Sequence, residues 1–541
     1  MDYKDTLNLP KTAFPMRANL PQNEPKQVEK WHREGTYFQV LEANARTPKF
    51  ILHDGPPYAN GNIHIGHALN KILKDIIVKY QSMTGHAAPY IPGWDCHGLP
   101  IELQVEKNLG RAKKLAMSKP EIRRLCKEYA EKYISIQRDE FKRLGVFGDW
   151  EHPYRTLDPA YEAQEVRELG KIAESGALYR QKKPVYWCAS CVTALAEAEV
   201  EYEDHTSASI YVKFPVKNDG GKLGAGVDTF FVIWTTTPWT LPANQAIAVH
   251  PKFVYRQVKT PQGKLILNQE LIPAVMNALG FESADYQITD GTWTGAELEG
   301  IVCRHPWIDR DSRVILGDFV TQDQGTGAVH IAPGHGQEDY ETGMRYGLPV
   351  MAPVDPEGKF TAEAGDLKGE SVFRADAIIL QKLTDAGALL KEDKLLHSYP
   401  HCWRCKKPVI FRATEQWFIS MEKEALRRQA LSAIEQVRWV PPWGRDRIRG
   451  MLESRPDWCI SRQRSWGVPI PAVYCKSCNE AVLNRPLCEH IAGIFEQEGS
   501  DAWYIRSVGE LLPEDFRCPQ CGGEDFSREE DILDVWFDSG V

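Results

Sequence analysis

The sequence has no long hydrophobic run: no stretch reaches the ~18 consecutive apolar residues of a membrane-spanning helix. Its first residues, Met1-Asp2-Tyr3-Lys4-Asp5, have neither the basic start nor the apolar core of a secretory signal. Internal repeats and low-complexity tracts are also missing, which argues against a repeat array or a largely disordered chain. We therefore expect a cytoplasmic protein with no membrane partner.

An excess of positive charge is absent as well. The 541 residues include 65 Lys and Arg against 74 Asp and Glu, a formal net charge of −9, so the composition gives no support for nucleic-acid binding. With 43% hydrophobic and 26% charged residues, the chain has the composition of an ordinary globular protein. Its length suggests three or four domains of ~150 residues.

The 13 cysteines are the first informative feature. Disulfides are disfavoured in the cytosol, and two thiolates of one tight turn can face the same metal ion. The last two pairs predict a zinc ribbon, and the first two, 210 residues apart, predict a second ribbon split by an inserted domain. Reduced cysteines without metal are the alternative, while redox chemistry lacks a thioredoxin-like pattern. The four Cys-x-x-Cys pairs are Cys188/Cys191, Cys402/Cys405, Cys475/Cys478 and Cys518/Cys521.

The first hundred residues have the pattern strand, loop and helix. Residues 50–52 are predicted to form a short buried strand ahead of a Gly/Pro-rich loop, and apolar residues from Leu69 to Tyr80 recur at the spacing of one helical face. This succession is typical of a nucleotide-binding α/β unit. His64 and His67 lie where the loop enters the helix, where backbone N–H groups and the helix dipole favour an anion. Histidines that only cap the helix or face solvent are the alternative.

A β-rich region lies between the first two cysteine pairs. Residues 209–214 and 229–234 are predicted strands, with a turn at 218–221, and the pattern continues to about 395. Residues 118–180 and 412–470 are charged and helix-rich. Ser118 is predicted to be the N-cap of a helix that has Pro120 in its first turn.

Seven segments follow one another in an order that covers nearly the whole chain. They include His64-Ile-Gly-His67, Thr235-Thr-Thr-Pro-Trp239 and the His330 block. Together these segments resemble the signatures of class I aminoacyl-tRNA synthetases, in the isoleucyl, bacterial-type form. The segments are residues 54–75, 93–102, 234–244, 325–330, 412–420, 460–467 and 534–540.

The resemblance implies an α/β fold: a Rossmann-like class I synthetase catalytic domain, incomplete at its C-terminal end, with an inserted β-rich editing domain and two zinc ribbons. The implied divisions are 1–180 for the N-terminal segment and first half of the catalytic domain, 181–200 plus 396–411 for the split ribbon, 201–395 for the editing (connective-peptide) domain, and 412–541 for the truncated second part of the catalytic domain with the second ribbon at 472–525.

It also implies ATP-dependent activation of isoleucine and its transfer to tRNA(Ile), with Mg²⁺ bound with the ATP and structural Zn²⁺ at two sites. His64, Gly66 and His67 would bind ATP, and the two histidines would stabilise the α-phosphoryl transition state. Asp95 would receive the ammonium group of isoleucine. Pro56 and Trp536 would line its side-chain pocket. Asp95 could instead cap a loop, and Trp536 could be an ordinary core residue.

The inserted domain answers a problem of selectivity. Isoleucine and valine differ by one methylene, worth only ~1–3 kcal/mol in a pocket, and this family is the usual example of that limit. The resemblance therefore implies a second site that hydrolyses valyl products, in which Asp339 would bind the ammonium group and His330 would restrict pocket size. A threonine run by itself is more typical of an ordinary strand. The implied editing residues are Thr235, Thr236, Thr237, Asn244, His330 and Asp339.

Two later elements of the family are missing from these 541 residues: the Glu-Gly-x-Asp-Gln-x-Arg-Gly-Trp block and the Lys-Met-Ser-Lys-Ser loop. Ala116-Met-Ser-Lys-Pro120 does not replace that loop, because it lacks the leading lysine and ends in proline. We therefore expect a monomer that activates isoleucine negligibly by itself. A stand-alone editing hydrolase of mischarged tRNA, a non-catalytic RNA-binding fragment, and another nucleotidyltransferase remain as alternatives.

Overall fold

The computed structural model describes residues 3–8, 10, 12–110, 113, 116–224 and 228–541. The chain divides into two compact units, residues 1–171 with 464–541, and residues 172–463. Among the described residues, no helix has both the length and the apolar character that crossing a bilayer requires.

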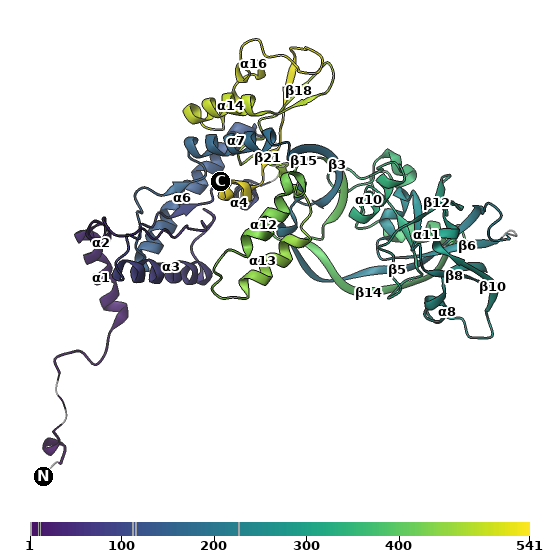
Figure 1. Ribbon diagram of the computed structural model, residues 1–541, viewed down its shortest axis with the longest axis horizontal. Coiled ribbons are helices and arrows are strands. Elements are labelled where there is room, and N and C mark those ends of the chain that lie inside the picture. Colours follow the sequence, from purple (N-terminus) through teal and green to yellow (C-terminus); the bar gives the residue numbers. More distant parts are fainter. Residues whose placement is uncertain (1–2, 9, 11, 111–112, 114–115, 225–227) are drawn as a thin grey trace. The chain divides into compact units, whose positions relative to one another are not determined.

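Before its break in the sequence, the first unit consists mainly of helices, of which α1, α2, α3 and α6 are labelled in Figure 1, and it also contains a short parallel strand pair. Strand β1 pairs with β2 in parallel, Gly93 opposite Tyr154, and isolated parallel bridges join Lys49 to Ala87 and Tyr58 to Asp95. The elements up to its break in the sequence are α1 (Leu20–Glu34), α2 (Thr36–Ala43), α3 (Ile65–Met83), β1 (Gly93–Trp94), α4 (Leu99–Leu109), α6 (Lys119–Arg143), β2 (Tyr154–Arg155) and most of α7 (Pro159–Glu174).

Helix α6 begins where the sequence predicts it. Ser118 is the N-cap, and the Glu121 carboxylate accepts hydrogen bonds from the Ser118 N–H (2.8 Å) and hydroxyl (2.6 Å). This reciprocal capping satisfies N–H groups that the first turn leaves free. The buried face of α6, which includes Cys126 and Phe141, packs in a core with Trp94.

Two features of the N-terminal half differ from what the sequence suggests. The predicted strand at 50–52 is wrong: only Lys49 forms a bridge, and Ile51 is 65% exposed. Helix α3 is confirmed, but its apolar stripe, which includes Leu69 and Tyr80, is exposed, whereas Lys71 is buried. The polar side of α3 faces inward, where Lys71 forms an ion pair with the buried Asp54.

After its break, the first unit resumes with a small three-stranded sheet and short helices. The strand order is β19-β18-β20, and Val473 of β18 pairs with Val482 and Arg528. The elements are β18 (Val473–Cys475), β19 (Ala481–Val482), α14 (Arg485–Glu498), α15 (Ala502–Ile505), α16 (Val508–Leu511), β20 (Phe526–Arg528), β21 (Ile532–Leu533) and α17 (Val535–Gly540).

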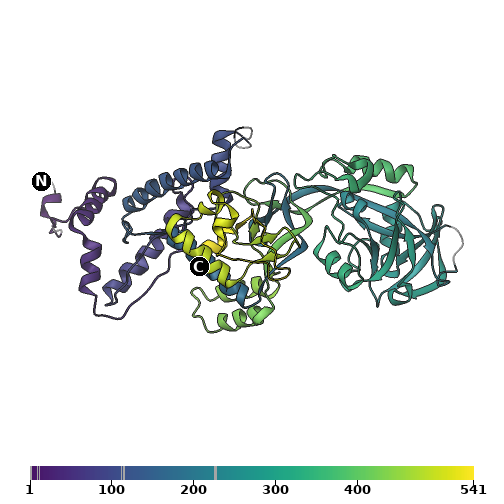
Figure 2. The same cartoon turned by 90° about the horizontal axis from the view of Figure 1, so that it is seen from above.

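The second unit contains a β-rich body, shown in teal in Figure 2. Its sheet has the order β10-β8-β9-β6-β5-β11-β12-β7-β13, and β14 also pairs with β5. The predicted strands at 209–214 and 229–234 are confirmed as parts of β5 and β6. The elements are β5 (Val200–Asn218), β6 (Thr229–Thr235), β7 (Ala246–Val249), β8 (Val254–Thr260), β9 (Gly263–Asn268), α8 (Ile272–Leu279), β10 (Gln287–Thr294), α9 (Gly295–Leu298), β11 (Val302–Arg304), β12 (Asp311–Leu316), β13 (Ala328–Ile331), α10 (Gln337–Arg345) and α11 (Asp376–Asp385).

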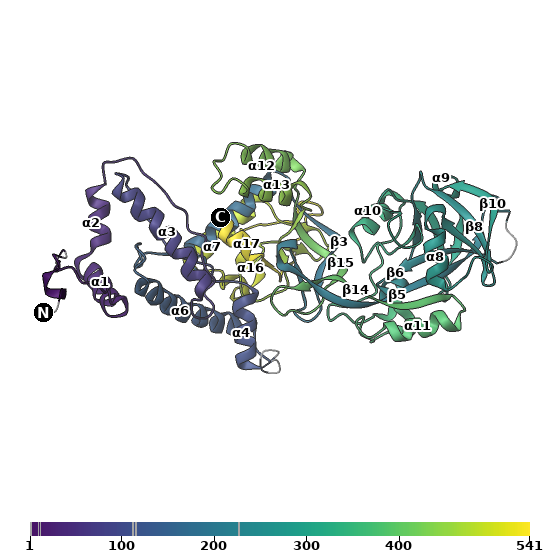
Figure 3. The same cartoon turned by 90° about the horizontal axis from the view of Figure 1, so that it is seen from below.

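A long antiparallel ribbon connects this body to a second sheet within the same unit (Figure 3). The ribbon consists of β5 and β14 (Leu389–Cys402), paired from Leu389–Val212 to Cys402–Val200. The second sheet has the order β16-β15-β3-β4, in which Leu178 pairs with Ile419. The remaining elements are β3 (Leu178–Cys188), β4 (Thr193–Leu195), β15 (Ile410–Ile419), α12 (Leu426–Ile434), α13 (Gly444–Glu453), β16 (Trp458–Cys459) and β17 (Ser461–Arg462).

Candidate functional site

His64 and His67 lie together at the N-terminus of α3. His64 is the N-cap residue: its Nδ1 accepts a hydrogen bond from Gly66 N–H (3.1 Å), and its own N–H is 3.3 Å from His67 Nδ1. The two rings stack with centroids 3.9 Å apart. Burial, followed by the nearby His64 and Lys71, lowers the pKa of His67, so this ring is neutral at pH 7 and can donate a hydrogen bond without carrying charge. The predicted capping role and the predicted phosphate-binding position therefore coincide.

A buried ion-pair cluster lies behind this helix. The Asp54 carboxylate pairs with Lys71 and, at 2.6 Å, with Lys74, while Lys71 also donates to the Tyr90 hydroxyl (3.1 Å). Burial would raise the pKa of Asp54, but the two ammonium groups lower it below its ordinary value. Sequence reasoning did not identify these lysines. They leave one positive charge in excess on the helix that carries His64.

Asp95 is buried and only 6% exposed, and its Oδ1 has no hydrogen-bond partner among the described residues. Its backbone pairs with the predicted pocket loop, since Asp95 N–H donates to Pro57 O (3.0 Å), next to Pro56. Burial and the neighbouring Asp538 raise the pKa of Asp95 to about 8. A buried carboxyl with a free oxygen is suited to receive a cationic group.

Other carboxyl groups surround Asp95. His97 Nδ1 is 2.9 Å from Asp538 Oδ2, and its Nε2 is 3.4 Å from Glu162 Oε1. Burial would lower the pKa of His97, but these carboxylates raise it to about 9. Glu165 is fully buried next to Asp538, and burial, followed by the nearby Asp538 and Glu162 carboxyl groups, raises its pKa well above the ordinary value. His97, Glu165 and Asp538 form a compact group that the sequence did not indicate.

The predicted pocket residues have different environments. Pro56 is half-buried and precedes Pro57, whose carbonyl accepts the hydrogen bond from Asp95 N–H. Trp536, by contrast, is 45% exposed in the first turn of α17. The Asp534 side chain caps that turn by accepting from Trp536 N–H (3.1 Å). Asp538 and Ser539 of the same helix interact with Asp95. Helix α17 therefore lies next to Asp95, while contact between Trp536 and Pro56 remains a prediction.

In the second unit, the threonine run ends β6 and leads into a short 3₁₀ helix, Pro238–Ala243. The hydroxyls of Thr235 and Thr237 are 3.3 Å apart, and Thr237 N–H donates to Thr235 Oγ1 (3.1 Å). Thr236 is half-buried between them. The run is therefore partly the end of an ordinary strand, which is the alternative given by the sequence, and partly a turn lined by hydroxyl groups.

His330 on β13 lies against this turn. The Thr240 hydroxyl donates to Thr237 O (2.9 Å) and is 2.9 Å from His330 Nε2. Because the hydroxyl proton is used on the carbonyl, the Thr240 oxygen accepts from His330 Nε2–H, and Nδ1 is left with a lone pair. His330 Nδ1 is buried and has no partner among the described residues. Burial and the nearby His335 lower the pKa of His330 to about 4, so the ring is neutral at pH 7.

Asn244 and Asp339 complete the predicted set. Asn244 is fully buried at the entrance to β7, where its Nδ2 donates to Ala246 O (2.9 Å), and its Oδ1 has no partner among the described residues. Asp339 accepts from Ala332 N–H (2.8 Å), two residues beyond His330. Burial raises the pKa of Asp339 to about 7. Both segments also run beside each other, since Ile247 of β7 pairs with His330.

Sequence reasoning missed two residues of this cluster. Thr240 fixes the tautomer of His330, and its place beside the Thr235–Thr237 run could have indicated it. His335 is 8% exposed, its Nδ1 is 2.9 Å from Phe411 O, and its ring meets Trp239 edge to face at 4.9 Å. No local sequence pattern indicates the contact between His335 and Phe411, because the two residues are 76 positions apart.

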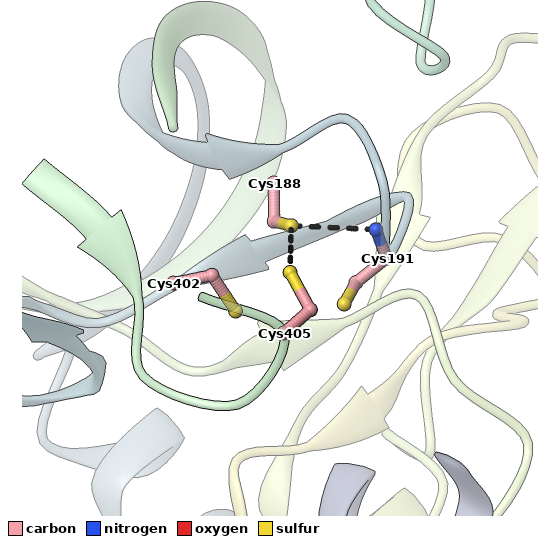
Figure 4. Close-up of side chains that lie close together, drawn as sticks. All are labelled: Cys188, Cys191, Cys402 and Cys405. Atoms are coloured by element: carbon pink, nitrogen blue, oxygen red, sulfur yellow. Dashed lines mark hydrogen bonds between the residues drawn. The ribbon is translucent and has the colours of Figure 1, made fainter. Parts of the chain in front are cut away.

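The first two cysteine pairs come together as predicted (Figure 4). Cys188 ends β3 and Cys191 lies in the turn after it, while Cys402 ends β14 and Cys405 follows it, and Cys188 Sγ is 3.5 Å from Cys405 Sγ. Four thiolates around zinc at ~2.3 Å would have sulfur atoms about 3.8 Å apart. The tetrad therefore has the dimensions of a closed tetrahedral site.

The last two pairs form a second tetrad of the same size. Cys475 Sγ lies 3.5 Å from Cys521 Sγ, and Cys478 Sγ lies 3.6 Å from Cys518 Sγ. None of the thirteen cysteines, all within the described residues, is in a disulfide. Both tetrads use all four thiolates, so they leave no open position for a substrate, which is the arrangement of structural zinc.

Comparisons with known proteins agree with the sequence pattern. The family model of tRNA synthetases class I (I, L, M and V) matches residues 26–541. Isoleucine--tRNA ligase of Kosmotoga olearia is 57% identical over 540 residues, and that of Moorella thermoacetica is 56% identical over 540 residues. Each alignment covers 100% of this chain and 57% of the relative. The chain thus spans less than three fifths of the length of the curated relatives it matches.

Among solved structures, the ternary complex of Agrobacterium radiobacter K84 agnB2 LeuRS-tRNA-LeuAMS aligns with 96% of this chain and 59% of that chain. The sequence identity is 17% and the TM-score 0.39. A superposition this loose does not assign roles to individual residues.

Proposed function

The chain belongs to the class I tRNA synthetase family (I, L, M and V), and from this premise we propose that it forms part of an isoleucine–tRNA ligase that also hydrolyses valyl products. The activity would use ATP with Mg²⁺, isoleucine and tRNA(Ile). The observation that carries the editing part is the cluster of Thr237, Thr240 and His330 beside Asp339.

For the synthetic site, the capped N-terminus of α3 supports phosphate binding. His64, Gly66 and His67 would hold ATP, since backbone N–H groups and two imidazoles converge there. The excess lysine charge next to Asp54 would favour the same anion. Asp95 would bind the isoleucine ammonium group through its unpartnered Oδ1, and Pro56 and Trp536 would flank the alkyl chain.

For the editing site, we propose a separate role for each of its residues. Asp339 in its ionised form would bind the valine ammonium group, and the neutral His330 ring would bound the pocket in which the side chain lies. The hydroxyls of Thr235, Thr236 and Thr237, with the free Oδ1 of Asn244, would position the attacking water and the ribose of the tRNA terminus. The water oxygen would form a bond to the ester carbonyl carbon, the bond from that carbon to the ribose oxygen would break, and the proton lost by the water would pass to the ribose oxygen, which releases valine and free tRNA.

The two cysteine tetrads fit structural Zn²⁺, because their sulfur spacing and closed coordination match that ion. Zinc would hold the ends of the insertion together at Cys188 and Cys402. The domain division at 180, 200, 395 and 411 remains a proposal. A cytoplasmic monomer is the state that we propose for this chain.

This chain would activate isoleucine negligibly by itself, because its 541 residues contain neither the Lys-Met-Ser-Lys-Ser loop nor the block that completes amino-acid binding in the family. A stand-alone editing hydrolase is the second candidate function, supported by the same threonine and histidine cluster. The two candidates differ in one respect: an editing hydrolase would be indifferent to replacement of His64 and His67.

The test is deacylation of valyl-tRNA(Ile) and isoleucyl-tRNA(Ile) by the 541-residue chain at high protein concentration. Selective hydrolysis of the valyl ester is expected. Equal hydrolysis of both esters would contradict the isoleucine assignment. If neither ester is hydrolysed, residues 200–395 are assayed alone, and inactivity of that domain as well would contradict the editing site.

A further inference from the structure

A helical hairpin in the second unit, residues 422–455, has a charge opposite to that of the whole chain. It contains eight Lys and Arg against five Asp and Glu, whereas the chain has a formal net charge of −9. The hairpin consists of α12 and α13, which lie side by side in Figures 1 and 3. Nothing in the sites described above uses this element.

The hairpin is firmly folded. The Arg427 guanidinium on α12 donates to Leu452 O (2.6 Å) and Arg455 O (2.7 Å) at the end of α13. Trp439 Nε1 donates to Ile434 O (2.9 Å), which secures the connection between the helices. Arg427 and Trp439 therefore stabilise the hairpin, and the other side chains on its surface project from a well-ordered backbone.

Helix α13 nevertheless has no buried residue. Trp443 is 62% exposed and Met451 is 48% exposed, and Arg447 lies between them at helical spacing i, i+4, i+8. These three side chains form one stripe, which we call the Trp443 stripe. The stripe therefore presents an exposed indole face and a guanidinium side by side on one helix.

The arginines of α13 fall into two groups. Arg449 is neutralised by Glu435 (2.9 Å) and Glu453 (2.9 Å). Arg447 is exposed and has no carboxylate partner among the residues that the structure describes, and the same holds for Arg438 just before the helix. The Trp443 stripe therefore contains one such cation, Arg447, whereas Arg449 on the same helix is paired.

A cavity of about 350 Å³ opens at the foot of the hairpin. Its walls include Arg427 and Arg455 from the hairpin, and Lys183, Tyr186 and Phe411 from β3 and β15. Its volume is at the lower end of the range for small-molecule sites, about 300–1,000 Å³. The hairpin thus contributes cations to this hollow as well as to the Trp443 stripe.

We propose that the Trp443 stripe binds a single-stranded segment of tRNA. Trp443 would stack on one base, and Arg447 would contact a neighbouring phosphate, which is the combination that single-stranded RNA sites use. Charge complementarity favours RNA over a protein partner, because the local positive charge lies in an acidic chain. The proposal rests on the proposed function for the identity of the RNA, but not for the binding chemistry.

The experiment measures the affinity of the full 541-residue chain for uncharged tRNA(Ile) by fluorescence anisotropy at salt concentrations from about 50 to about 200 mM. The affinity of a protein that contacts phosphates falls strongly over this range. Trp443→Ala should weaken binding about 5- to 150-fold, and Trp443→Phe should retain most of the affinity. Arg447→Ala should reduce the slope of log K against log salt by about 0.7–0.9. Arg449→Ala is the matched control, and its slope should equal that of the wild type.

Unchanged affinity in Trp443→Ala together with an unchanged slope in Arg447→Ala would overturn the proposal, as would a wild-type chain that binds no tRNA at 50 mM salt. A change in self-association of Trp443→Ala, with RNA affinity intact, would identify a protein contact instead. Valyl-tRNA deacylation in the same samples separates the two proposals: if neither the wild-type chain nor residues 200–395 alone hydrolyse the valyl ester, while RNA binding still depends on Trp443, only the editing site of the proposed function is refuted.

Discussion

The pH dependence of editing provides the sharpest test of the site around Asp339. Burial raises the pKa of this carboxyl from 3.8 to about 7. An acid is neutral below its pKa, so the fraction able to bind an ammonium group rises from ~10% at pH 6 to ~90% at pH 8. The kcat/KM for valyl-tRNA(Ile) reports groups of the free enzyme and free substrate, and the substrate's α-amino group, with an ordinary pKa of ~7.7–8.0, begins to lose its proton in the same interval. The kcat/KM should therefore rise about six-fold from pH 6 to a maximum near pH ~7.4 and fall at higher pH.

Asp339→Asn should abolish this acid limb. The amide keeps an acceptor for Ala332 N–H but cannot pair with a cation. Loss of a buried charge pair typically costs ~2–5 kcal/mol, which is at least a 30-fold fall in kcat/KM. Glu338→Gln is the matched control: this neighbouring carboxylate only raises the pKa of Asp339, so its removal should retain activity and move the limb to slightly lower pH. An identical acid limb in Asp339→Asn would refute the reasoning, after subtraction of spontaneous ester hydrolysis.

Three further predictions concern other parts of the chain. The purified chain should contain two zinc ions by elemental analysis, and Cys402→Ser should reduce this to one, since one tetrad is broken and the other is independent; an unchanged zinc content would contradict that site. Ser118→Ala should lower the free energy of unfolding by ~0.5–2 kcal/mol in urea titration, because it removes the N-cap of α6, and unaltered stability would contradict the capping role. Isoleucine binding measured by calorimetry should strengthen from pH 6 to pH 8, as Asp95 with its pKa of about 8 ionises, and Asp95→Asn should remove this trend; pH-independent binding by the wild type would contradict the assignment.

Local patterns explain why some elements were predictable from the sequence. Ser118 and Glu121 form a capping box that depends only on residues three apart, and His64 caps α3 for the same reason. The cysteine tetrads were predictable because a structural zinc ion needs four ligands and each Cys-x-x-Cys pair supplies two. Two pairs 210 residues apart can therefore bind the same ion. In each case the decisive physics lies within a turn, or in the coordination number of one ion.

The remaining features depend on contacts that no local pattern records. The exposed apolar stripe of α3 contradicts the usual inference from periodicity, since the inward face contains Lys71, whose ion-pair partner Asp54 lies outside the helix. His97 illustrates the same limit in the site itself. In sequence it is one histidine in a Gly/Pro-rich loop, yet its partner Asp538 lies 441 residues away, and together they set the charge next to Asp95. An amino-acid site therefore cannot be derived from its motif alone: the motif supplies Asp95, while burial in the fold and, after it, the distant Asp538 carboxyl group set the pH at which that residue can bind an ammonium ion.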